Sequence, residues 1–107
     1  MTEKEKKLEY LKEEFKKLDN DMFATMVYDL DEILALSYEV YLEKGLNGKQ
    51  ILNEMSDFLT DVVLNNLEFC QYVIYNQESI IETHQKWGTF LVDICQFTLV
   101  ASTLGGT

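Results

Sequence analysis

The chain has 107 residues, 47% hydrophobic and 26% charged, a composition that predicts one folded domain and argues against a disordered segment. Nineteen acidic residues against nine basic ones, all lysine, give a formal net charge of −10. A charge of this sign disfavours direct binding to nucleic acid and to anionic membrane surfaces, because both repel it. Proline is absent and only five residues are glycine, so the turns of an all-β fold are missing.

The fold class predicted from these features is all-α. We expect a single-domain bundle of four helices, or of five if the third one breaks, over residues 1–107. Within it, residues 1–18 form a Lys/Glu-rich N-terminal helix, and residues 21–107 form an acidic bundle body.

The first predicted helix covers residues 2–18. Thr2 followed by Glu5 is a capping box, and Glu3 with Lys7 has the spacing of an intrahelical ion pair. Its apolar residues recur every three or four positions among Glu and Lys, as in an amphipathic helix with a narrow stripe. The stripe consists of Leu8, Leu11, Phe15 and Leu18.

The second predicted helix covers residues 21–44. Asp19, Asn20 and Asp21 break the preceding pattern and supply side chains that can cap the new helix, while Gly45 suits the position after its end. The face expected to be buried consists of Phe23, Met26, Val27, Leu30, Leu34, Tyr38 and Tyr41.

The third predicted helix begins after Asn47 and carries apolar residues at helical spacing up to Ile74, with an alternative break at Asn65 and Asn66. The last helix is expected to start with Asn76 as its cap and to end at Gly105 and Gly106. Its segment around residues 81–99 is expected to be the most buried part of the bundle.

The apolar run from Gly88 to Leu104 raises the question of a membrane span. A spanning helix needs about 20 apolar residues, and Asp93 would place a charge near the middle of the bilayer. The sequence therefore predicts a core helix and no membrane span.

Acidic residues follow helical spacing on the second and third predicted helices. They suggest two negative rows on neighbouring helices that could bind a basic partner surface, either by imitating the charge of nucleic acid or as a less specific acidic docking surface. The alternative is an ordinary solvated face. The row on the second helix, here called the α2 ridge, consists of Asp29, Glu32, Glu39 and Glu43. The row on the third, here called the second ridge, consists of Glu54, Asp57, Asp61 and Glu68.

Tyr72 and Tyr75 lie beside Gln71, Asn76 and Gln77 in an uncharged, aromatic segment. Tyrosines in such surroundings are typical of protein interfaces, although ordinary tyrosines at the rim of a small bundle give the same pattern. We therefore add Tyr72 and Tyr75 to the acidic residues as candidate partner-binding residues.

No pattern in the chain indicates catalysis, a cofactor or a metal site. The single histidine, His84, has Ile81 three residues before it, so the Glu-x-x-His pair of carboxylate metal sites is absent, and His84 is expected at the edge of the core or on the surface. The cysteines, Cys70 and Cys95, lie in apolar segments and are expected to be buried thiols of a cytoplasmic protein, with a disulfide as the alternative.

The predicted function is binding to another protein with a basic surface. The favoured role is a stoichiometric inhibitor, either an anti-defence protein of a phage or mobile element or a bacterial immunity protein against a toxin. In size and helical content the chain resembles the small four-helix immunity proteins of bacteria, with which it shares no motif. The alternative is a helical adaptor, chaperone or assembly module that uses apolar helix stripes and could be a homodimer.

Overall fold

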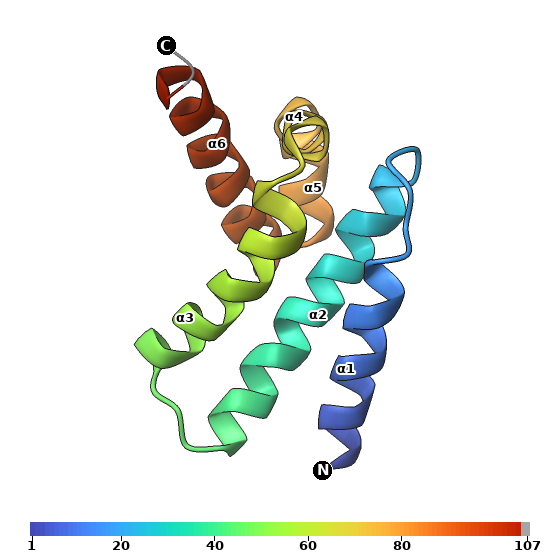
Figure 1. Ribbon diagram of the computed structural model, residues 1–107, viewed down its shortest axis with the longest axis vertical. Coiled ribbons are helices and arrows are strands. Elements are labelled where there is room, and N and C mark those ends of the chain that lie inside the picture. The colour runs from blue at the N-terminus through green and yellow to red at the C-terminus, as the bar shows by residue number, and fades with distance from the viewer. Residues whose placement is uncertain (106–107) are drawn as a thin grey trace. The chain divides into compact units, whose positions relative to one another are not determined.

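The computed structural model describes residues 1–105, of which 82% are helical, and no strand occurs among them. The all-α prediction is confirmed. The predicted four or five helices are too few, because two predicted helices are interrupted. The elements in chain order are α1 (Glu3–Phe15), α2 (Phe23–Glu43), α3 (Gly48–Leu59), the π-helical turn η1 (Thr60–Leu64), α4 (Leu67–Tyr75), α5 (Gln77–Thr83) and α6 (Trp87–Gly105) (Figure 1).

The chain divides into two compact units, Met1–Phe58 and Leu59–Thr107. The first contains α1, α2 and α3, and the second contains η1 and α4 to α6.

In the first unit, α1 and α2 run antiparallel side by side (Figure 1). The Phe15 ring lies 6.0 Å from the Phe58 ring of α3, and Lys12 places its ammonium 5.2 Å from the centre of the same ring. Burial lowers the pKa of Lys12, because it disfavours the charged form. On α2 the predicted face is partly wrong. Phe23, Tyr38 and Tyr41 are only half-buried, whereas Ile33, Ser37 and Val40 are buried.

The start of α1 has the predicted cap, in which the Thr2 hydroxyl accepts a hydrogen bond of 3.2 Å from the Glu5 amide. The start of α2 does not. Its N-cap is Met22, which makes no side-chain capping bond, and the Met22 amide instead donates to the Asp19 carbonyl at 2.9 Å in a turn. The acidic segment before α2 therefore forms a backbone turn.

The loop between α2 and α3 is built as its sequence predicts. Gly45 has a φ of +86°, the left-handed region that glycine enters without strain. The amides of Leu46 and Gly45 donate to the carbonyls of Tyr41 and Leu42, which is the Schellman pattern. Asn47 and Gln50 then exchange two hydrogen bonds of 2.9 Å as the capping box of α3.

The third predicted helix breaks at Asn65 and Asn66, as the alternative expected. The π-helical turn η1 follows α3, and the Asn66 side chain then caps α4 by accepting a hydrogen bond of 3.1 Å from the Phe69 amide. The α4 helix therefore starts anew at Leu67, as a separate helix with its own N-terminal cap.

The last predicted helix is two helices, because the chain bends at residues 84–86 between α5 and α6. Asn76 was expected to cap the start of this helix, but its side-chain amide donates to the Tyr72 carbonyl at 2.9 Å, at the end of α4. The α6 helix ends at Gly105, and Gly106 lies outside the described residues.

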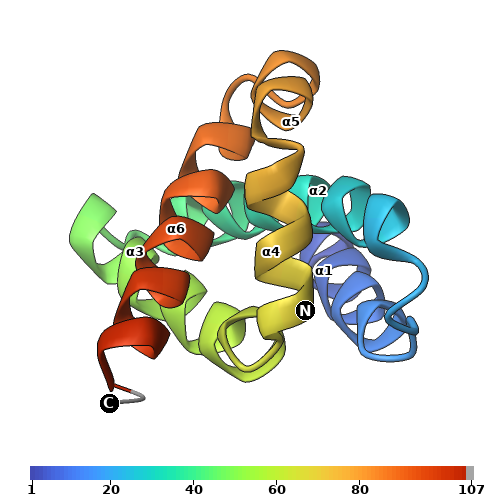
Figure 2. The same cartoon turned by 90° about the horizontal axis from the view of Figure 1, so that it is seen from above.

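The core of the second unit lies where α4 and α5 pack on α6 (Figure 2). Only 22% of the residues from Trp87 to Leu104 are buried, so the expectation that this helix is the most buried is wrong. The bend before α6 explains the difference, because α4 and α5 cover one side of α6 and leave its other residues to solvent. The fully buried large side chains of this unit are Leu59, Val63, Phe69, Cys70, Val73 and Cys95.

Candidate functional site

The α2 ridge is partly neutralised within the first unit. The Lys4 ammonium lies 2.7 Å from a Glu43 carboxylate oxygen and 3.8 Å from one of Glu39, and Lys7 lies 3.3 Å from Glu32. Lys7 thus pairs across helices and not with Glu3, as its spacing had suggested. Exposed pairs of this kind add little to stability, but they reduce the negative potential that the ridge presents.

Asp29, the remaining member of the α2 ridge, is half-buried. Its pKa is raised, mainly by burial and further by the neighbouring charge of Glu32. The ridge is therefore weaker than the uncompensated row of charges that the sequence suggested.

The second ridge is not one row in the structure. Glu54 and Asp57 lie on α3 in the first unit, whereas Asp61 lies on η1 and Glu68 on α4 in the second. All four side chains are exposed. The four residues would form one row only on a continuous helix. The chain breaks at residues 65–66, so Glu68 lies on a separate helix.

Tyr75 is the most exposed large hydrophobic side chain among the described residues of the second unit, with 91% of its surface accessible, whereas Tyr72 is half-buried. Of the two candidate tyrosines, Tyr75 is the more accessible to a partner. It lies at the junction of α4 and α5, at the edge of a surface groove of about 430 Å³, here called the tyrosine groove. The groove is lined by Tyr75, Asn76, Gln77, Glu78, Ser79 and Glu82.

Glu78 and Glu82 were missed as site residues by the sequence reasoning. They lie one turn apart on α5 and both are exposed. Their i,i+4 spacing directly after Tyr75 is a signal that the sequence contains, and the helix break at Asn76 places them with the tyrosine in one groove.

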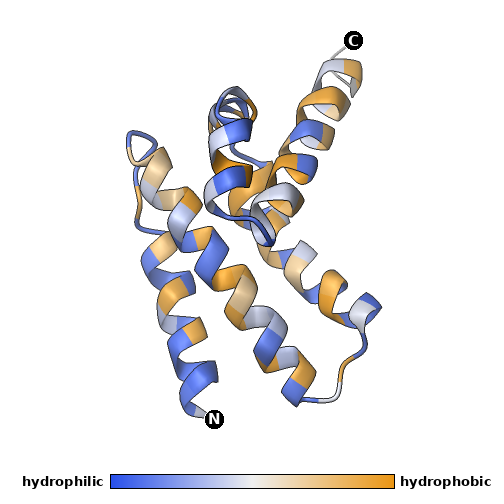
Figure 3. Cartoon of the chain, turned by 180° about the vertical axis from the view of Figure 1, so that it is seen from behind, coloured by the Kyte–Doolittle hydropathy of each residue, from blue (hydrophilic) through white to orange (hydrophobic). Residues whose placement is uncertain are grey.

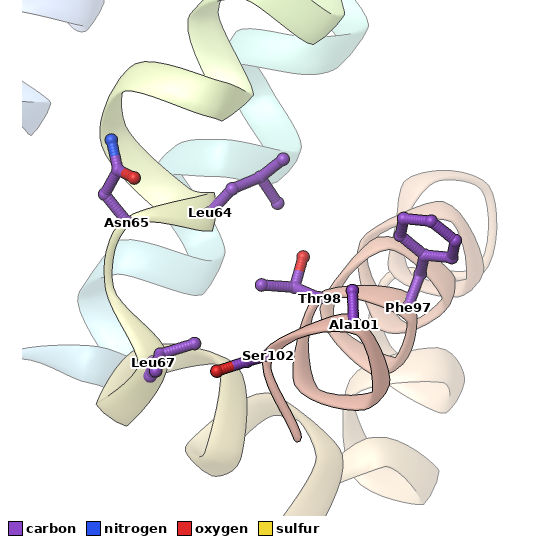
Figure 4. Close-up of a pocket in the computed structure, with 7 residues that line it drawn as sticks. All are labelled: Leu64, Asn65, Leu67, Phe97, Thr98, Ala101 and Ser102. Carbon is purple, nitrogen blue, oxygen red and sulfur yellow. The ribbon is translucent and has the colours of Figure 1, made fainter. Parts of the chain in front are cut away.

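A second groove, of about 490 Å³, lies between α6 and the segment that joins η1 to α4. It is here called the α6 groove. Leu64 and Leu67 face Thr98 and Ser102 across it, and the ring of Phe97 stands at its rim (Figure 4). It is lined by Leu64, Asn65, Leu67, Phe97, Thr98, Ala101 and Ser102.

Hydrophobic residues recur along α6 and alternate with polar ones (Figure 3). Phe97 exposes 75% of its surface, Val100 48% and Leu104 72%. Among the described residues, Trp87–Leu104 is also the one helix long and apolar enough to cross a membrane. Length and composition are weak evidence for a span, because the core helix of a soluble protein has the same properties. Asp93 lies within this segment.

The described residues contain no group of three or more His, Cys, Asp or Glu side chains arranged to hold a metal ion. His84, expected at the core edge or surface, is buried at the bend between α5 and α6. Both cysteines are buried and free, in agreement with the prediction of buried thiols.

Comparison with known proteins places this chain in no family. No protein-family model, no curated protein and no solved structure matches it.

Proposed function

We propose that the protein binds another protein through the tyrosine groove, and that it acts as a stoichiometric inhibitor by occupying a basic surface of that partner. The observation that carries the proposal is Tyr75, which is 91% exposed at the edge of a groove that also contains Glu78 and Glu82. A tyrosine has a large apolar ring, few rotatable bonds and a hydroxyl, and it is enriched among residues that dominate interface energies.

The charges around Tyr75 favour a basic partner. A lysine or arginine from the partner can lie over the tyrosine ring and reach a carboxylate in the same groove, which combines a cation–π contact with an ion pair. Within residues 59–107 the only basic side chain is Lys86, so little competes for the carboxylates. The acidic residues of this range are Asp61, Glu68, Glu78, Glu82 and Asp93.

The α2 ridge is a weaker candidate for the same role. Glu32, Glu39 and Glu43 are already paired with lysines of α1, and a partner would have to displace those lysines. The exposed residues of the second ridge remain part of the proposal as residues that attract the partner over a distance, since surface charge mainly affects the rate of association.

We expect Tyr75→Ala to weaken binding to the partner by tenfold or more, because loss of a central aromatic contact typically costs about 2 kcal/mol. The partner would first be identified in the native host with a photo-crosslinking residue at position 79, which lines the groove and leaves Tyr75 in place, and its affinity for the purified chain measured by titration calorimetry. Tyr10→Ala is the matched control, because Tyr10 is 63% exposed on α1 and lies outside the groove. Equal affinities of the two variants would contradict the proposal.

Charge reversal separates the groove from the second ridge. Glu78→Lys with Glu82→Lys should lower both the association rate and the affinity, because these carboxylates lie beside Tyr75. The triple reversal Glu54→Lys, Asp57→Lys and Asp61→Lys should slow association about tenfold at low salt if the ridge steers the partner. If only the triple variant has an effect, the ridge and not the groove is the binding surface.

The α6 groove supports a second candidate function, an adaptor or assembly module that binds through apolar contacts. Phe97 and Leu104 are mostly exposed, and no residue between Ile94 and Leu104 is ionisable except Cys95. An uncharged face on a chain with a net charge of −10 lets a second copy approach without direct like-charge contact.

For this candidate we expect a dimer in sedimentation equilibrium at micromolar concentration. Phe97→Ser with Leu104→Ser should convert it to monomers, and added salt should change the dimer little, because apolar contacts are not screened. A wild-type monomer at these concentrations would exclude a stable homodimer.

A further inference from the structure

The bend between α5 and α6 occurs in a segment that contains no helix-breaking residue. Its three residues are His84, Gln85 and Lys86, and α6 begins directly after them. Glutamine and lysine are good helix formers, and proline is absent from the whole chain. The nearest glycine, Gly88, already lies inside α6. The residue types at the bend do not require it, and the same segment can also form a helix.

Regular helical hydrogen bonds flank the bend on both sides. The His84 amide donates to the Ile80 carbonyl at 2.8 Å, and the Gly88 amide donates to the His84 carbonyl at 2.6 Å. Each bond spans four residues, as in an α-helix. The backbone of His84, with a φ of −121° and a ψ of 65°, is not helical and interrupts the pattern. A rotation centred on His84 would therefore join α5 and α6 into one helix.

A continuous helix would satisfy backbone groups at the end of α5. The carbonyls of Ile81, Glu82 and Thr83 lie in its last turn, where no amide of the same helix can reach them. In a straight helix the amides of residues 85–87 would donate to these carbonyls. A lone chain would lose more than it gains, because straightening takes α6 away from α4 and α5, on which it packs. The core of the second unit would then be exposed to water.

We propose that the protein forms a domain-swapped dimer with a second copy of itself, in which the bend straightens in both chains and each α6 packs on α4 and α5 of the other. The contacts of α6 are then preserved between molecules, and each chain gains the hydrogen bonds of the straightened segment. The cost is the entropy of association, so high protein concentration favours the dimer. Separation requires α6 to leave both cores, so return to monomers is slow.

The swapped dimer is distinct from a dimer formed through the α6 groove. The exposed residues Phe97 and Leu104 take no part in it, because α6 uses the side that is already packed on α4 and α5. The tyrosine groove, residues 75–79 and Glu82, precedes the bend, so each half of the dimer keeps a complete groove. An inhibitor in this form would present two grooves, a consequence that rests on the proposed function, whereas the swap itself does not.

The first experiment uses the wild-type chain, with dithiothreitol present to exclude disulfide-linked dimers. Labelled and unlabelled protein are mixed at millimolar concentration, warmed to just below the melting temperature, cooled and separated by gel filtration. We expect a dimer fraction that persists after dilution to micromolar concentration. Isotope-filtered NMR of this dimer should detect contacts between α4 of one copy and α6 of the other. Absence of a persistent dimer, or a dimer without these contacts, would overturn the proposal.

Gln85→Pro tests the role of the bend. In a straight helix a proline at residue 85 clashes with the Ile81 carbonyl and disfavours the helical backbone at His84. In the bent chain His84 is already non-helical and Gln85 is exposed, so proline is tolerated there. We expect the association constant to fall at least about a hundredfold, while the melting temperature of the monomer is unchanged or raised. The matched control, Gln85→Ala, should dimerise as the wild type does, and equal dimer fractions in the two variants would contradict the proposal.

Hydrogen exchange at Gln85 provides a measurement that needs no variant. In the straightened dimer its amide lies within a helix, and we expect it to exchange at least about tenfold more slowly than in the monomer. Equal exchange in the two forms would show that the bend persists in the dimer. This measurement decides the question if circular dichroism shows that Gln85→Pro does not fold.

Discussion

Gly88→Ala is expected to lower the free energy of unfolding by about 2 kcal/mol, because there is no space for its methyl group. A Cβ at this position would lie 2.7 Å from the Ile80 carbonyl oxygen and 3.2 Å from the Cβ of His84. That carbonyl already accepts the His84 amide at 2.8 Å, so the α5 backbone would have to shift. Such overpacking costs about 1–3 kcal/mol, only partly offset by the higher helix propensity of alanine.

Two other glycines provide controls in the same urea titration. Gly48 is the first residue of α3 and has no atom within 4 Å of the added Cβ, so Gly48→Ala should leave stability unchanged or raise it slightly. Gly45 is equally open, but its φ of +86° makes alanine strained, so Gly45→Ala should be mildly destabilising. If Gly88→Ala lowers the free energy of unfolding no more than Gly48→Ala does, the backbone of α5 can move away from α6 without loss of stability, and the prediction is wrong.

Phe69→Ala should have the largest effect on stability, a loss of about 3–5 kcal/mol. Phe69 lies on α4 and its side chain has no accessible surface, so truncation removes a complete ring from the packed interior and leaves a cavity. A loss of this size is a large part of the total stability of a small domain, typically about 5–15 kcal/mol. We therefore expect a strongly lowered melting temperature, measured by far-UV circular dichroism.

Phe97→Ala is the matched control for this change. It removes the same ring from a side chain that is 75% exposed on α6, and stability should change by no more than about 0.5 kcal/mol. If Phe69→Ala fails to fold, Phe69→Leu provides a smaller, measurable loss. A similar effect of Phe69→Ala and Phe97→Ala would mean that the core is not where the structure places it.

The predicted local structure succeeded where the signal lies within a few residues. The Thr2 cap, the left-handed Gly45 and the start of α3 after Asn47 each depend on hydrogen bonds between neighbours in sequence. The cap predicted from Asp19 to Asp21 was wrong. These residues form a backbone turn, and the helix begins after Met22 without a side-chain cap.

The candidate site was predictable only in part. The exposed Tyr75 stood out in the sequence because its neighbours are polar and uncharged. Glu78 and Glu82 did not stand out, because two exposed carboxylates one turn apart are common on a solvated helix face. The ion pairs that partly neutralise the α2 ridge could not be predicted from spacing, because Lys4 and Lys7 lie on α1 and reach the ridge only when the two helices pack.

The sequence by itself determined the helical class, the charge and most helix ends, because composition, spacing and capping act over one or two turns of chain. The tertiary structure alone decided which faces are covered. The bend at residues 84–86 turns one long apolar helix into α5 and a largely exposed α6, and the packing of α4 on α6 buries Cys70 and Cys95 in the core of the second unit. These contacts join residues far apart in the chain, and no local pattern specifies them, because their free energy comes from burial between helices.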